Sequence, residues 1–213
     1  MTPSEVTRQD LEALVSKANE LAKEMGLTLH LDPSKINLQP GDNVHGNYNE
    51  DDNNITLNYD QKGIFDQDLI KILVHEGTHE KFDKEIVPNC KNYITKCYIS
   101  ALFDENLAYA VQFFFDAEIY TQGLGSKNPE VFRQTNCHYP QLGYAIAKAC
   151  KNGMKMDEIF DKVKTIQLSD DPKYPSAIVA KFIRDDLGIK LTDVFEKENA
   201  NKYERCIAAE AAQ

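Results

Sequence analysis

The feature that most constrains this chain is an H-E-x-x-H motif at residues 75–79, which directly follows an apolar run at 69–74. On a helix, residues four apart stand one turn apart on the same face, so His75 and His79 can grip one metal ion. Glu76 then lies beside the metal, where it can take a proton from bound water. The whole chain has 5 histidines. Two of them in this spacing indicate a zinc site.

A catalytic zinc ion takes three protein ligands and keeps one position for water. We expect Glu105 to be the third ligand, because it lies in a segment that is apolar on nearly every side. Such a helix is buried, and a carboxylate within it is unfavourable unless it meets a cation. Glu118 is the second candidate and Asp104 the third. Alternatively, Asp104 and Glu105 stabilise a helix N-terminus through its dipole.

The periodicity of the apolar residues predicts a mostly helical chain. Helices are expected at residues 4–25, 65–85, 89–123 (one long helix or two abutting ones), 129–136, 140–152, 156–166, 175–187 and from 191 onward. Alternating apolar residues predict a short strand at 27–31, and two more short strands are expected at 44–48 and 55–59, joined by a polar hairpin loop. The expected fold class is α+β, predominantly helical, with a small antiparallel sheet preceding the zinc-binding helix.

Length and charge restrict the organisation and the partners. A chain of 213 residues that is 42% hydrophobic suits one domain over 1–213, with the region after about 153 as an appended helical part. The net charge of −10 argues against nucleic acid and anionic membranes as partners. A solvated surface explains most of the acid, and an acidic groove that prefers basic substrates is the other interpretation. No stretch reaches the roughly 18 apolar residues of a membrane helix.

The cysteines bear on the compartment. The 5 cysteines are odd in number and form no C-x-x-C pair, which is typical of reduced thiols in the cytosol. The first residues lack the basic start and apolar core of a signal peptide. We therefore expect a cytoplasmic protein, or one exported without a cleaved signal peptide. The oligomeric state has no signal in the sequence.

With its H-E-x-x-H motif and a Glu105-x-x-Ala108 stretch downstream, the chain resembles the zincin metallopeptidases, and among them the gluzincin group. The resemblance covers roughly residues 44–112. It implies a zinc-dependent peptidase that acts on a protein or peptide, and a strand edge near 55–57 along which an extended peptide pairs. Gluzincins often place an Asp close after the third ligand to hold a histidine, whereas Tyr109 stands four residues after Glu105 here. The third-histidine continuation of other zincins is absent.

The expected chemistry is hydrolysis by an activated water. Zinc lowers the pKa of its water to around 7 and polarises a carbonyl, while Glu76 accepts the water proton and passes it to the leaving amine. A donor is also needed for the developing oxyanion. Tyr139, in a polar turn before a helix, is the first candidate, and His138, Tyr109 and Tyr144 compete with it.

Two other hypotheses compete with the peptidase. One is a zincin-like scaffold retained as a catalytically silent binding or regulatory module, which holds zinc but cleaves no peptide. The other is a helical interaction protein with an accidental motif, in which His75→Ala leaves stability and metal content unchanged. A non-peptide substrate is also open, because an activated water attacks other amides and esters.

Overall fold

A computed structural model describes residues 6–60, 62–115, 140–166, 178, 180–195 and 197–211. The helices are α1 (Arg8–Glu24), α2 (Gln67–Glu85), α3 (Tyr93–Ile99), α4 (Glu105–Phe115), α7 (Pro140–Lys151), α8 (Met156–Lys164) and α10 (Lys197–Ala211). The strands are β1 (Ile36–Pro40), β2 (His45–Asn49) and β3 (Asn54–Tyr59). Short helical turns lie at Pro33–Lys35, Val87–Asn89, Ser100–Asp104 (η3), Phe182–Asp186 and Leu191–Asp193. The prediction of a predominantly helical α+β fold is confirmed. The helix expected at 129–136 lies outside the described residues, as does the first part of the one expected at 175–187.

The three strands form one mixed sheet in the order β1-β3-β2. β2 and β3 form the expected hairpin and pair antiparallel, with Tyr48 opposite Ile55. β1 pairs with β3 in parallel, with Ile36 opposite Ile55. The expected small sheet is therefore mixed: the hairpin pairs antiparallel as expected, whereas β1, a strand that the sequence analysis did not expect, pairs in parallel. The reason is that β3 returns between β1 and β2, which gives it the direction of β1.

The strand expected at 27–31 is wrong. Its three leucines are buried, but the segment pairs with no strand in the described part of the chain. It passes instead beneath α2 at Gly77, where a Cβ would lie 2.8 Å from Cδ2 of Leu31. The Thr28 N–H donates to the carboxylate of Asp157 on α8 at 3.2 Å. Packing of this extended segment against α2 and one side-chain acceptor on α8 thus take the place of a neighbouring strand.

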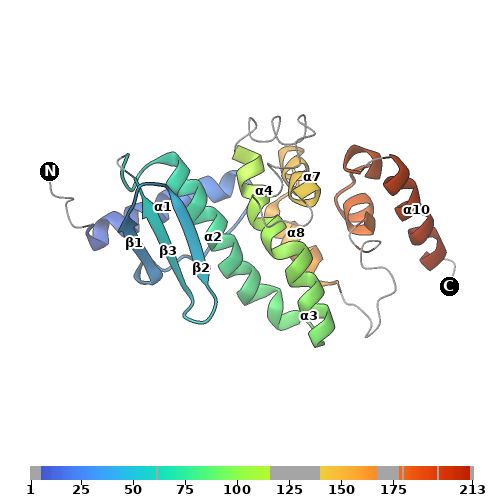
Figure 1. The fold of residues 1–213 in the computed structure, drawn as a ribbon, viewed down its shortest axis with the longest axis horizontal. Helices are drawn as coiled ribbons and strands as arrows, with labels where there is room; N and C mark the ends of the chain where they lie inside the picture. Colours follow the sequence, from blue (N-terminus) through green and yellow to red (C-terminus); the bar gives the residue numbers. More distant parts are fainter. Residues whose placement is uncertain are drawn as a thin grey trace.

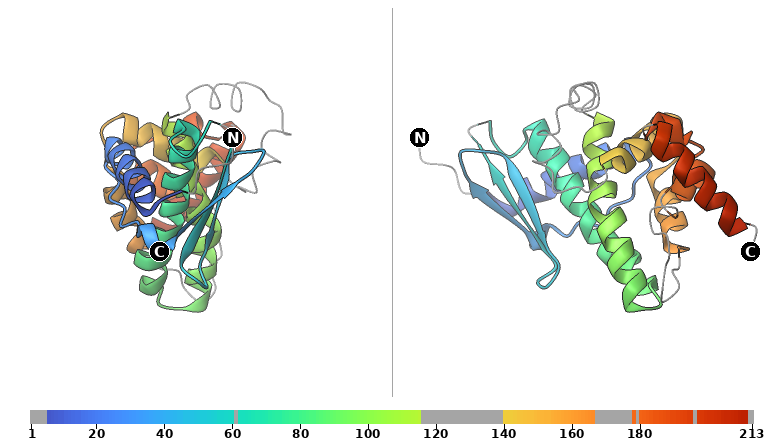
Figure 2. Two further views of the ribbon diagram at one scale, coloured as in Figure 1. Left: turned by 90° about the vertical axis from the view of Figure 1, so that its left-hand side faces the viewer. Right: turned by 45° about the vertical axis from the view of Figure 1, so that its right-hand side comes forward.

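Helix α2 is the central element of the molecule. Figures 1 and 2 show it between the sheet and α4, with α7 and α8 beyond α4 and α10 at the far end. Its packing against α1, α4 and the sheet buries Leu69, Leu73, Val74 and Phe82. One connected core runs from α1 to α10. None of the described helices combines the length and apolar character needed to cross a membrane.

Candidate metal centre

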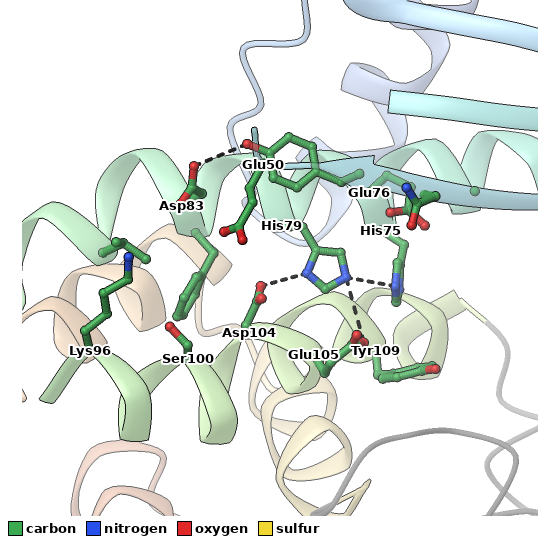
Figure 3. A pocket seen from close by; sticks show the side chains of 15 residues that line it. Glu50, His75, Glu76, His79, Asp83, Lys96, Ser100, Asp104, Glu105 and Tyr109 are labelled. Atoms are coloured by element: carbon green, nitrogen blue, oxygen red, sulfur yellow. Dashed lines mark hydrogen bonds and ion pairs between the residues drawn. The ribbon is translucent and has the colours of Figure 1, made fainter. Parts of the chain in front are cut away.

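Helix α2 places the two histidines of the motif one turn apart, facing α4 (Figure 3). The Nε2 atoms of His75 and His79 are 3.2 Å apart. Glu105, the first residue of α4, brings its Oε2 to 3.8 Å from Nε2 of His79. The three ligand atoms all lie within 4.8 Å of one another. The fold thus brings together the two histidines and the carboxylate that the sequence singled out.

Both imidazoles are engaged through hydrogen bonds on the side away from this cluster. Nδ1 of His79 lies 2.7 Å from Oδ1 of Asp104, and because an ionised carboxylate only accepts, the proton sits on Nδ1. Nδ1 of His75 lies 3.4 Å from Nε2 of Gln112, and the His75 ring donates to the main-chain carbonyl of Ala108. The two Nε2 atoms face each other. With its proton on Nδ1, His79 turns the Nε2 lone pair toward the position that a cation between the rings would take.

A π-helical turn lets two adjacent carboxylates reach the site. The turn η3 joins α3 to α4 within a helical run from 93 to 115. Residues that are neighbours in a regular helix point in directions about 100° apart, and the wider π turn changes that register. Asp104 ends η3 and Glu105 begins α4, and both side chains contact His79. Because α4 has no free N-terminus here, the helix-dipole interpretation of these two residues has no physical basis.

The start of α4 is fixed from behind by a buried amide. Asn106 is 1% exposed, and its Nδ2 donates to the carbonyl of Leu102 at 2.8 Å. Its Oδ1 accepts from the N–H of Gly143 on α7 at 3.1 Å. A Cβ on Gly143 would lie 3.0 Å from the Asn106 carbonyl, so glycine permits this close approach of α7. The neighbouring Glu105 is therefore carried by a rigid backbone.

Glu76 lies beside the ligands and beneath β2. Its side chain is 7% exposed, and it accepts a hydrogen bond from the main-chain N–H of Tyr48. A Cβ on Gly46 would lie 2.8 Å from Oε1 of Glu76, so glycine permits this contact between β2 and α2. Burial raises the pKa of Glu76 to about 6, although the charge of His79 and the Tyr48 N–H act in the opposite direction.

The two histidines differ in their pKa shifts. Burial, together with the charge of His79, lowers the pKa of His75 to about 3. Burial also lowers the pKa of His79, but the hydrogen bond and charge of Asp104, with the charges of Glu105 and Glu76, outweigh it and raise that pKa. His75 is therefore neutral, as a metal ligand must be, and the environment of His79 favours a positive charge.

The site opens into a cavity of about 600 Å³ between β2, α2 and the α3–α4 run. Its described lining includes five carboxylates and a single lysine, namely Glu50, Glu76, Asp83, Asp104, Glu105 and Lys96. Figure 3 shows Glu50 reaching into the cavity from the β2 side. A cavity of this size and sign can take an extended, positively charged ligand.

The remaining predicted site residues have different outcomes. Tyr139, His138 and Glu118 lie outside the described residues. Tyr109 lines the cavity, and its ring centroid is 5.1 Å from that of His75. Tyr144, on α7, is not among the described lining residues.

The position of the strand edge is a correction. Residues 55–57 lie in β3, which is the central strand and is paired on both sides. The strand at the cavity is β2, which has a free edge among the described strands. Sequence reasoning missed Gly46, although a glycine inside a strand is a recognised sign of close backbone approach.

These groups define the class of site: a candidate metal centre with an adjacent carboxylate base. Comparisons of the chain with protein-family models, with curated proteins and with solved structures gave no match. The functional argument therefore rests on the motif and on the geometry of the cavity.

Proposed function

We propose that the chain is a zinc-dependent metallopeptidase. The observation that carries the proposal is the convergence of His75, His79 and Glu105, with Glu76 beside them, at one end of a cavity bordered by a free strand edge. The reaction is hydrolysis of a peptide bond by an activated water. Free thiols at Cys90, Cys97, Cys150 and Cys206 fit a reducing compartment such as the cytosol.

The donor set fits zinc. Tetrahedral zinc with bonds of about 2.0–2.1 Å to nitrogen separates its ligand atoms by about 3.3 Å, and the two Nε2 atoms are 3.2 Å apart. The Glu105 oxygen, at 3.8 Å from His79, lies about half an ångström further out than that spacing. Its side chain is 47% exposed, so it has room to turn inward. Bound zinc would supply Lewis acidity and lower the pKa of a coordinated water to about 7.

Glu76 is suited to the role of general base. A base works best when its pKa lies near the operating pH, and burial raises the pKa of Glu76 to about 6. The Tyr48 N–H holds the carboxylate on the ligand side of α2. Among the candidate oxyanion donors in the described residues, Tyr109 is the one that lines the cavity, and we assign it that role.

A peptide substrate follows from β2. The outer edge of this strand borders the cavity, and its residues from Gly46 to Tyr48 line it. An extended peptide that adds to such an edge gains main-chain hydrogen bonds regardless of its sequence. The scissile carbonyl would then lie between the strand and the three ligands. Small amides and esters have no extended main chain that could form these hydrogen bonds with β2.

The decisive experiment is Glu76→Gln. Zinc content should stay near one equivalent, because Glu76 is not a ligand, while hydrolysis of a peptide library should fall about 10²–10⁴-fold. Glu12→Gln, which makes the same change on the exposed face of α1, is the control. Absence of bound zinc in the parent protein would refute the metal centre. Bound zinc without any cleavage by the parent would favour the silent module instead.

A further inference from the structure

We propose that the end of the cavity away from the ligand cluster binds a lysine or arginine side chain of the substrate, through Glu50 and Asp83. This proposal rests on the proposed peptidase function and names its substrate class. The two carboxylates come from different elements. Glu50 follows β2, and Asp83 lies on α2 one turn after His79. Both line the same cavity as the ligand cluster (Figure 3).

The first argument is that these carboxylates have no cation of their own. Three of the five lining carboxylates already have roles in the proposed centre: Glu76, Asp104 and Glu105. Asp83 accepts a hydrogen bond from the neutral Tyr48 hydroxyl at 3.3 Å. Within the described residues, neither Glu50 nor Asp83 forms an ion pair, although Lys96 lines the same cavity. The charges of Asp83, Glu80 and Glu50 add to burial in raising the pKa of the Tyr48 hydroxyl, which marks a negative potential at this end.

The second argument concerns the shape of the ligand. A compact metal ion requires several ligand atoms that converge. Among the described residues, His75, His79 and Glu105 form a group of three such ligands, and neither Glu50 nor Asp83 belongs to one. Phe82 and Val87 also line the cavity, and Phe82 precedes Asp83 directly in α2. Lysine and arginine side chains place an apolar stem on such a wall and a charged head against carboxylates. A long amphipathic cation therefore fits better than a second metal ion.

The third argument is burial of polar groups that face the same space. His75 and Glu76 are each only 7% exposed, yet both line the cavity. Buried polar groups that line an open cavity are typical of a binding site. The acidic end with Glu50 and Asp83 is part of the same cavity as this centre. A substrate side chain bound there would hold the peptide close to the reacting bond.

The test uses matched peptides. A digest of a synthetic peptide library by the parent protein, read by mass spectrometry, identifies the favoured cut sites. The position near the cut site at which lysine or arginine is most frequent is then varied, and peptides that carry lysine, norleucine or glutamate there are compared. We expect the lysine peptide to be cleaved with the highest kcat/KM. Glu50→Gln and Asp83→Asn should each lower that value about fivefold and should leave the norleucine peptide unchanged.

A binding measurement separates this inference from the proposed function. Zinc-loaded Glu76→Gln protein should bind the fluorescent lysine peptide more tightly than the norleucine peptide, by fluorescence anisotropy at low salt. Asp51→Asn is the control, because it removes an exposed charge from the same hairpin outside the cavity lining. Cleavage or binding without preference for lysine would overturn the inference and leave the peptidase intact. No cleavage at all, with lysine-selective binding retained, would overturn the peptidase alone.

Discussion

The acidic residues on the two faces of α2 have different hydrogen-bond partners. On the face away from the cavity, Glu80 is paired with Lys84, and Glu85 accepts from Lys81 and from Lys164 of α8, each at 2.7 Å. On the cavity face, the carboxylates accept from neutral donors: Glu76 accepts from the Tyr48 N–H and Asp83 from the Tyr48 hydroxyl. Glu80 and Glu85, on the face away from the cavity (the rear face), thus have their counter-charges within the protein. This is the difference that our two proposals require, because both bring a cation, either a metal ion or a substrate side chain, to the cavity acids from outside.

Among the variants that compare the two faces, Gly46→Ala should have the largest effect on stability and hydrolysis, because Gly46 lies where β2 contacts the cavity face. The new Cβ would lie 2.5 Å from Cγ2 of Ile72 and 2.7 Å from Cγ of Glu76, so β2 must move away. Overpacking of this kind costs about 1–3 kcal/mol of unfolding free energy. The shift also removes the Tyr48 N–H from Glu76, so hydrolysis should fall as well. Urea unfolding and peptide cleavage measure the two effects.

Gly77→Ala is the counterpart on the rear face. There the new Cβ would meet the ends of leucine side chains, 2.8 Å from Cδ2 of Leu31 and 3.2 Å from Cδ1 of Leu29. These atoms can turn aside, and alanine is favoured over glycine inside a helix by about 1 kcal/mol. Cleavage by Gly77→Ala should match the parent. If both variants lose cleavage equally, the contact of β2 with Glu76 has no special role.

The fold was predictable where side-chain burial follows the period of the element. β3 and α2 have clear apolar patterns, and the structure has both, and β2, within a few residues of the expected positions. Alternation at 27–31 misled, because it reports which side chains are buried and not what the backbone pairs with. β1 was missed although Ile36 and Leu38 alternate with Asn37 and Gln39, because the pattern covers only four residues and lies between Pro33 and Pro40.

The candidate site was predictable as a set of ligands but not as a network. Spacing alone put His75 and His79 on one helical face, and the apolar surroundings of Glu105 marked it as a partner. The resemblance led the search for a histidine-holding Asp to the residues after Glu105. The residue that bonds to His79 is Asp104, one position before. The π turn that aims both carboxylates at His79 changes the helical register, and the periodicity of the sequence does not show it.

Asp104→Ala therefore tests the network separately from the ligands. Without the carboxylate at Nδ1, the His79 ring loses its fixed tautomer and orientation, and zinc affinity should fall about 10–100-fold. Competition with a chromophoric chelator measures this. Asp104→Asn should lose less, because the amide oxygen can still accept from Nδ1. An affinity unchanged in Asp104→Ala would mean that Asp104 does not orient the ring.

The smallest expected effect belongs to the rear face. Lys164→Met removes the cation that lies 2.7 Å from Glu85, and since both side chains are partly exposed, the cost should be about 0.2–1 kcal/mol of unfolding free energy. Burial raises the pKa of Glu85, but hydrogen bonds from Lys164 and Lys81 outweigh it and lower that pKa below its ordinary value.

The direction of that shift sets the pH dependence. A carboxyl whose pKa is lower in the folded state stabilises the fold above its unfolded pKa, and this contribution is lost as the pH falls through the folded pKa. The gap in urea midpoint between parent and Lys164→Met should therefore be present at pH 7 and shrink toward pH 3. Lys23→Met, on the exposed face of α1, should show no such change. Cleavage and zinc content should match the parent in both variants, because the rear pairs only hold α2 against α8. A loss of zinc in Lys164→Met would mean that the two faces of α2 are not independent.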